Sequence, residues 1–253
     1  MSNWNVLAEL DPFWAILSNP TKKFGKWDPQ QFFDTGDREA QRVLDMCTKN
    51  RIAPAYGKLL DFGCGVGRMT RAFSRFFSSC IGIDASGKMV ELARKFNADR
   101  PDCEFVACSA PALPFPDKTF DFVFSLLVLQ HLPRKNMILR YISEFIRVAK
   151  DNGVVVFQLT NELPWRQRLQ GRRRLWSLFT ALGAPESWLF KKLRLSPIAM
   201  NGISSQKVET LVESKGAEVK ALELYLRKNG HDSYYYFVIK RPADSRVKYM
   251  SAV

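Results

Sequence analysis

The sequence of 253 residues predicts a doubly wound α/β fold, and three observations support this prediction. Short apolar runs of the kind that form buried strands alternate with longer segments in which apolar residues recur at helical spacing. A glycine-rich turn at 61–67 directly follows the first run, and Asp84 ends the second. Strands joined through helices in this way form a parallel sheet with right-handed crossovers and helices on both faces.

Each element of this fold has its own signal in the sequence. Strands are expected at 58–62, 80–84, 104–108, 120–127, 153–159, 218–226 and 233–240. Helices are expected at 39–47, 69–77, 89–96, 134–149 and around 208–212. Asn229-Gly230 is a hairpin signal between the last two strands. We therefore expect a Rossmann-like, seven-stranded sheet, mostly parallel, with its last strand antiparallel.

The glycine turn predicts a cofactor that contains adenosine. Gly63, Gly65 and Gly67 allow the backbone to turn sharply and to approach a ligand closely. An aspartate about 20 residues further on, here Asp84, can accept hydrogen bonds from both ribose hydroxyls. A dinucleotide-binding turn would carry a third glycine where this chain has Arg68, so a different adenosine cofactor is indicated.

Two stretches of sequence identify the cofactor by resemblance. The turn Asp-Phe-Gly-Cys-Gly-Val-Gly at 61–67, followed by Ile-Gly-Ile-Asp-Ala-Ser at 81–86, resembles class I S-adenosylmethionine-dependent methyltransferases. Leu-Pro-Phe-Pro-Asp at 113–117 and Val-Leu-Gln-His-Leu at 128–132 are similar to the fourth-strand region of the type 11 branch. The resemblance covers about 58–159 and implies S-adenosyl-L-methionine as the cofactor.

The resemblance implies cofactor contacts in and beside the turn. The backbone of the turn would face the methionine part of the cofactor, and Asp61 would orient its amino group. The residues expected here are Asp61, Gly63, Cys64, Gly65, Gly67 and Arg68.

Further cofactor contacts are implied at the ends of the following strands. Asp84 would hold the ribose hydroxyls, and Ala85 would lie against the adenine. Many family members carry an aspartate where this chain has Ser109, so the adenine contact is expected to be weaker or to come from the backbone of Ala110. Ser125 would lie close to the sulfonium.

Five segments follow from these signals. We expect an aromatic helical cap at 1–50, an S-adenosylmethionine-binding core at 51–162, a basic lid-like insertion at 163–203, completion of the core sheet at 204–241 and a tail at 242–253. In the cap, Trp27, Phe32 and Phe33 are candidates for a gate over the cofactor, with core packing as the alternative.

The composition bears on metal binding and on the cellular location of the protein. The five cysteines are scattered and never spaced as metal ligands, so reduced thiols and no metal site are expected. No apolar stretch reaches the roughly 20 residues of a membrane-spanning helix, and the N-terminus does not resemble a secretory signal. A cytoplasmic protein is therefore expected.

Methyl transfer is an in-line displacement, which requires positioning more than a catalytic dyad. The expected acceptor is an oxygen or nitrogen of a small molecule, anionic or hydrophobic. A hydroxyl acceptor benefits from a base, and His131, just after the fourth strand, is the candidate. Capping of the following helix, or tying down the loop that contains it, is the competing role for this histidine. A non-catalytic partner subunit with the same fold stays an alternative, and the oligomeric state is left open.

The net charge of +13 is concentrated in the insertion. Its cations between Leu163 and Leu195 are Arg166, Arg168, Arg172, Arg173, Arg174, Lys191, Lys192 and Arg194. Its apolar residues close to one helical face are Trp165, Leu169, Trp176, Phe179 and Leu182. A substrate lid is the first interpretation, an anionic membrane surface the second and RNA the third. The alternative to all three is a purely structural role, in which the cations face solvent and the apolar residues pack on the core.

Overall fold

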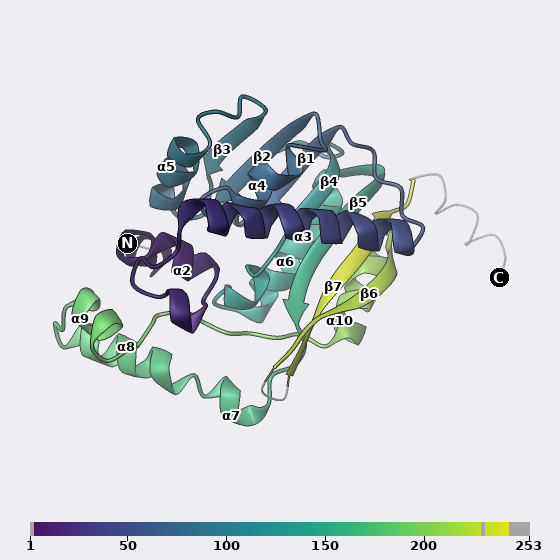
Figure 1. Cartoon of the computed structure of the whole chain (residues 1–253). Helices are drawn as coiled ribbons and strands as arrows, with labels where there is room; N and C mark the ends of the chain where they lie inside the picture. Colours follow the sequence, from purple (N-terminus) through teal and green to yellow (C-terminus); the bar gives the residue numbers. More distant parts are fainter. Residues whose placement is uncertain (1–2, 229–230, 243–253) are drawn as a thin grey trace.

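The computed structural model describes residues 3–228 and 231–242, which form a seven-stranded sheet in the order β3-β2-β1-β4-β5-β7-β6 (Figure 1). The strands are β1 Lys58–Phe62, β2 Ser79–Asp84, β3 Cys103–Ala107, β4 Phe120–Ser125, β5 Ala149–Thr160, β6 Ala217–Lys228 and β7 His231–Lys240. β7 is antiparallel to both of its neighbours, whereas the pairs among β1 to β5 are parallel. The predicted doubly wound sheet with an antiparallel last strand is confirmed.

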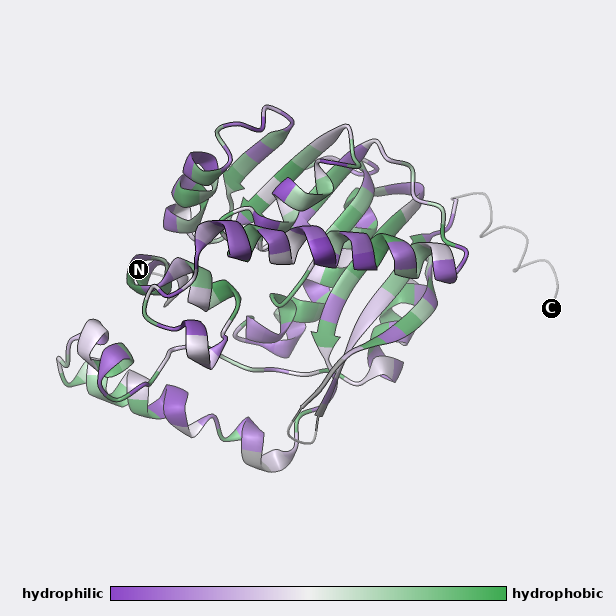
Figure 2. Cartoon of the chain, viewed as in Figure 1, coloured by the Kyte–Doolittle hydropathy of each residue, from purple (hydrophilic) through white to green (hydrophobic). Residues whose placement is uncertain are grey.

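Helices cover both faces of this sheet. They are α1 Asn3–Leu10, α2 Pro12–Ile16, α3 Pro29–Lys49, α4 Arg68–Phe73, α5 Gly87–Phe96, α6 Lys135–Val148, α7 Trp165–Arg168, α8 Gly171–Ala181, α9 Glu186–Lys191 and α10 Ser205–Ser214, with 3-10 turns η1 Pro20–Lys22 and η2 Leu129–His131. Figure 2 shows hydrophilic residues along the outer side of α3 and hydrophobic residues along the strands. None of the helices in the described ranges combines the length and apolarity needed to cross a bilayer.

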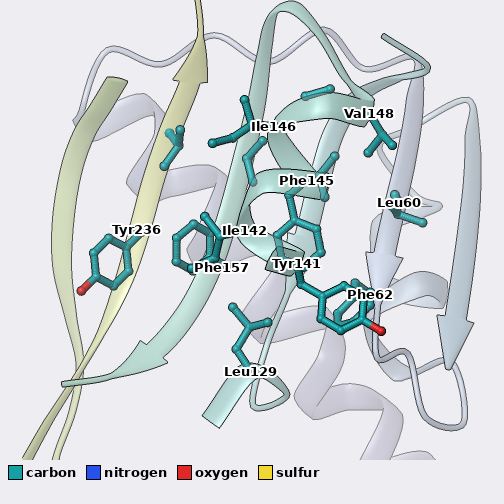
Figure 3. Close-up of a cluster of buried hydrophobic side chains, with 14 of the residues drawn as sticks. Leu60, Phe62, Leu129, Tyr141, Ile142, Phe145, Ile146, Val148, Phe157 and Tyr236 are labelled. Atoms are coloured by element: carbon teal, nitrogen blue, oxygen red, sulfur yellow. The ribbon is translucent and has the colours of Figure 1, made fainter. Parts of the chain in front are cut away.

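One face of the sheet packs against α6 and α10 (Figure 3). Successive strand residues point to opposite faces, so Leu60 and Phe62 lie on this side, whereas Leu59 lies on the other. The rings of Phe157 on β5 and Tyr236 on β7 stack with centroids 4.9 Å apart. This contact joins the antiparallel strand to the parallel part of the core.

The opposite face packs against α3 and α4. Val43 on α3 and Phe73 on α4 are fully buried there with Phe122 and Phe124 of β4. Because both faces are covered, the central strands are apolar on both sides, which is typical of a parallel sheet.

The segment between β3 and β4 is fixed by Arg147 near the end of α6. Its guanidinium donates to the carbonyls of Phe115 at 2.9 Å and Leu113 at 3.1 Å. It also pairs with Asp117 at 2.7 Å and Glu144 at 2.8 Å. The Glu144 carboxylate also accepts from the Leu113 amide at 2.8 Å, so two side chains of α6 hold the Leu-Pro-Phe-Pro-Asp stretch.

Two sequence-based expectations need correction. The helix after the glycine turn ends at Phe73 rather than 77, because the chain turns there and the Phe76 amide donates to the Phe73 carbonyl. The apolar residues of the insertion do not share one helical face, because Gln170 takes a left-handed φ of 46° that separates α7 from α8. The residues of the predicted hairpin turn, Asn229-Gly230, lie outside the described ranges, although β6 and β7 pair as a hairpin requires.

Candidate active site

The glycine turn crosses from β1 over the end of β2. Gly63, Gly65 and Gly67 have φ values of 77°, 55° and 84°, in the left-handed region that favours glycine. The amides of Gly63 and Cys64 both donate to the carbonyl of Ile83, at 2.7 and 3.0 Å. These bonds hold the turn against the second strand.

Each glycine also lacks room for a side chain. A Cβ on Gly63 would meet Val128, and one on Gly65 would lie 2.5 Å from Ile16 Cδ1. Gly67 is different, because its Cβ would meet Phe105 of β3 below the turn, at 2.7 Å. Two of the glycines therefore shape the side of the turn that faces a cavity, and the third allows packing beneath it.

Asp84 lies beside the turn at the end of β2. Its Oδ2 accepts from the Gly65 amide at 2.9 Å, and its Oδ1 accepts from the Ser86 amide at 2.8 Å. Burial raises the pKa of this carboxyl, and the backbone donors oppose that shift. Each oxygen has a second lone pair, so the carboxylate can still accept two hydroxyl protons from a ligand.

A cavity opens at the carboxyl ends of the strands, where ligands of open α/β sheets bind. Six of the predicted site residues line it: Gly63, Gly65, Asp84, Ala85, Ser109 and His131. The remaining lining is largely apolar and includes Met89, Leu126, Leu127, Val128, Leu132 and Met137. The structure thus brings together residues that come from four separate stretches of the sequence.

Three of the predicted cofactor residues belong to the turn but do not line the cavity. Asp61 is buried and accepts from Thr70 Oγ1 at 2.7 Å, and burial raises its pKa to about 6. Cys64 and Gly67 are likewise outside the lining. Asp61 thus connects the turn to α4, the helix that contains Thr70.

Three further predicted residues also lie away from the wall. Arg68 is buried against α3, where its guanidinium donates to Thr35 Oγ1 at 3.3 Å. Ser125 donates to the Phe62 carbonyl at 3.1 Å and so ties β4 to β1. The carbonyl of Ala110 accepts from the hydroxyl of Tyr141, which does line the cavity, at 3.0 Å.

His131 combines burial with a fixed ring orientation. Its Nδ1 lies 2.8 Å from the carbonyl of Ala199, so this nitrogen carries the proton and donates it. Nε2 then has a free lone pair, and burial lowers the pKa of the imidazole, which keeps it neutral. A neutral imidazole on a cavity wall, with one nitrogen held by a backbone carbonyl, can accept a proton from a ligand.

The cap contributes different residues from those expected. Trp4, Ala15 and Ile16 line the cavity, and the Trp4 ring lies 5.7 Å from the His131 ring. Trp27, Phe32 and Phe33 do not line it. They pack with one another and with Phe13 and Phe96, so the core-packing alternative holds for these three.

The second residue after β4, Leu127, is held in an uncommon conformation. Leu127 has a φ of 61°, which is unfavourable for a residue with a Cβ. Its amide donates to Gln158 Oε1 at 3.2 Å, and its side chain lines the cavity. Strained residues of this kind cluster at ligand sites. No periodicity in the sequence signals this position.

Within the described residues, no group of three or more potential metal ligands occurs. The order of the strands is Rossmann-like, and the cavity lies at the edge of the sheet where such folds bind ligands. Residues 60–157 match the family model described as a methyltransferase domain. This match begins within β1 and ends within β5, so the chain is similar to that family over less than half of its length.

Two curated relatives are similar to this chain over part of their length. An uncharacterized methyltransferase, YcgJ, of Bacillus subtilis is 32% identical over 112 residues, which is 44% of this chain and 43% of that protein. The chloroplastic tocopherol O-methyltransferase of Arabidopsis thaliana is 28% identical over 162 residues, 58% of this chain and 46% of the relative. The chain thus spans less than half the length of either relative.

A solved structure covers more of the chain. An S-adenosylmethionine-dependent methyltransferase from Clostridium acetobutylicum aligns with a TM-score of 0.57 at 12% identity, over 80% of this chain and 91% of that one. At this identity the likeness extends to the fold alone. The family match ends within β5, so the cap and the insertion lie outside it.

Proposed function

We propose that this protein transfers a methyl group from S-adenosyl-L-methionine to a hydroxyl of a small, largely apolar molecule. The observation that carries the proposal is one cavity that joins the glycine turn and the Asp84 carboxylate to the free nitrogen of His131. The cofactor site and the base would then act on the same ligand pair.

The residues present fit the cofactor. Gly63 and Gly65 line the cavity with bare backbone, so an amino-acid moiety could approach their main-chain atoms closely. The Asp84 carboxylate has lone pairs for two ribose hydroxyls, and Ala85 and Ser109 stand further along the same wall for the adenine. When bound, the cofactor supplies a methyl group on a positively charged sulfur, which needs no further activation.

The residues of the chain would position the acceptor, limit the access of water and accept a proton. Trp4 and Ile16 of the cap line the cavity with apolar side chains, which would limit the access of water to the methyl group. Nε2 of His131 would accept the proton of the acceptor hydroxyl as its oxygen attacks. The Ala199 carbonyl stabilises the resulting imidazolium through Nδ1.

The cavity wall and one relative support this choice of acceptor class. The lining near His131 includes Leu127, Leu132 and Met137, so an apolar body would be bound beside the base. Tocopherol, named for the Arabidopsis relative, is a molecule of this kind, with one phenolic hydroxyl on an apolar body. We propose phenolic or similar apolar alcohols as the first acceptors to assay.

The test compares His131→Asn with His231→Asn, which changes the other histidine of the chain. Asparagine at 131 can still donate to the Ala199 carbonyl but cannot accept the proton, so turnover should fall by about 10²–10⁴-fold. The dissociation constant of S-adenosyl-L-methionine, measured by calorimetry, should stay within about 2-fold. Turnover close to that of the unaltered protein in the 131 variant would remove the base from the proposal. Absence of cofactor binding in the unaltered protein would overturn the proposal as a whole.

A further inference from the structure

A second cavity lies between the cap and the insertion, and four cations line it. Lys23 and Lys26 come from the cap, Arg172 comes from α8, and Arg194 follows α9. Figure 1 shows α8 and α9 beside α2, beyond the carboxyl ends of the strands. We infer that this cavity binds a phosphate group, and this inference does not rest on the proposed methyl transfer.

Lys23 is the most enclosed of the four cations. Its ammonium lies 4.0 Å from the centre of the Phe190 ring, 4.5 Å from that of Trp14 and 5.1 Å from that of Phe24. Aromatic faces attract a cation and hold it in place. Burial lowers the pKa of this lysine, and the positive charges of Arg194 and Arg172 lower it further.

The cluster lacks matching negative charge. In the ranges 3–228 and 231–242, no carboxylate forms an ion pair with any of the four cations. Asp11, whose negative charge acts to raise the pKa of Lys23, is buried. Its Oδ2 already accepts from the amides of Phe24 at 2.6 Å and Gly25 at 3.0 Å.

Like charges held around one cavity repel one another unless an anion lies between them. Two guanidinium forks and two ammonium groups match the oxygens and the double charge of a phosphate better than a single carboxylate. The cations belong to the cap and the insertion, so a bound phosphate would bridge two segments that the family match does not include. This bridging gives the excess charge of the insertion a specific role.

The phosphate could be carried by a soluble molecule or by a phospholipid headgroup. The chemistry at the four cations is the same in both cases. Exposed apolar side chains in and near the cavity, such as Phe24 at 42% and Leu193 at 41% exposure, would contact acyl chains only in the second. A soluble phosphate probe and a phospholipid probe therefore distinguish the two sources.

The experiment compares two double variants of equal charge. Arg172→Gln/Arg194→Gln removes cations from the cavity wall, whereas Arg174→Gln/Lys191→Gln removes exposed cations of the same insertion that do not line it. Binding of inorganic pyrophosphate is measured by calorimetry at constant ionic strength, without cofactor or acceptor. Binding to phosphatidylglycerol vesicles is measured by sedimentation, with phosphatidylcholine vesicles as the neutral reference.

The expected result is that the cavity variant loses at least about 10-fold in affinity for one of the two probes, while the control variant changes by less than about 3-fold. Loss with pyrophosphate assigns a soluble source, and loss with vesicles alone assigns a headgroup. Equal losses in both variants would overturn the inference, because diffuse charge would then suffice. Absence of binding to either probe would overturn it as well, whether or not the protein transfers methyl groups.

Discussion

At the scale of single residues, His131 shows how a backbone carbonyl can decide the role of a side chain. Because Nδ1 is committed to Ala199, only Nε2 can exchange a proton with a ligand in the cavity. Ala199 belongs to the insertion, 68 residues further along the chain. The candidate base is therefore oriented by a segment that the family match leaves out.

The pH dependence of turnover tests this arrangement. Burial lowers the pKa of His131 from its usual 6.5, so the imidazole should be neutral and able to accept a proton throughout the physiological range. We expect kcat/KM to be flat above about pH 6.5 and to fall below the lowered pKa, where the ring becomes protonated. A profile that rises only above about pH 8 would contradict a histidine base.

Asp61 allows a second test, based on stability. Burial raises its pKa from 3.8 to about 6, so the folded protein binds this proton more tightly than the unfolded chain does. Because the pKa is higher in the folded state, protonated Asp61 contributes fully to the free energy of unfolding below about pH 4. This contribution is lost as the pH rises to about 6. Ionised Asp61 should therefore lower the free energy of unfolding at neutral pH.

The variant Asp61→Asn removes this titration. Relative to the unaltered protein, its free energy of unfolding should increase by about 2–3 kcal/mol between pH 4 and pH 7. Urea unfolding of both proteins at several pH values measures the difference. All other titratable groups are the same in the two proteins, so their contributions cancel when the two free energies are subtracted. A difference that stays constant with pH would show that Asp61 is not the titrating group.

At the scale of elements, Arg147 connects α6 to the loop before β4. It satisfies two carbonyls and pairs with two carboxylates, although it lies near the surface. Arg147→Met should lower the free energy of unfolding by about 1–3 kcal/mol, because the loop carbonyls lose a charged donor. Arg140→Met, an exposed change on the same helix, is the control and should cost under about 0.5 kcal/mol. Equal losses in the two variants would contradict this role.

The sequence predicted elements well where local periodicity decides structure. β1 was predicted with its observed bounds, and β2 and α6 within one residue, because buried apolar runs and helical stripes are local signals. The split between α7 and α8 was missed, because the left-handed conformation falls on Gln170, and a single non-glycine residue gives little warning of it. Trp4 and Ile16 were missed as cavity residues for another reason. Their position depends on how the cap docks, which no local pattern encodes.

At the scale of the whole molecule, the cofactor cavity is bounded by both the sheet and the cap. A ligand there contacts the ends of β1 and β2 together with Ala15 and Ile16 of α2. S-adenosylhomocysteine at about 100 times its dissociation constant should stabilise the folded state by about 2.7 kcal/mol. For a chain of this size, that corresponds to a rise in Tm of about 5–10 °C. Calorimetric melting measures the shift, and an unchanged Tm at millimolar ligand would contradict this placement of the site.

Helix α2 separates the two cavities of the protein. Ile16 and Ala15 face the glycine turn, whereas Trp14, between Ala15 and Phe13, lines the cationic cavity. Any shift of this five-residue helix alters both cavities at once. Occupancy of one cavity should thus change affinity in the other, and thermodynamic reciprocity requires the same factor in both directions. A phosphate compound that tightens binding in the first cavity would itself be retained more tightly when that cavity is occupied.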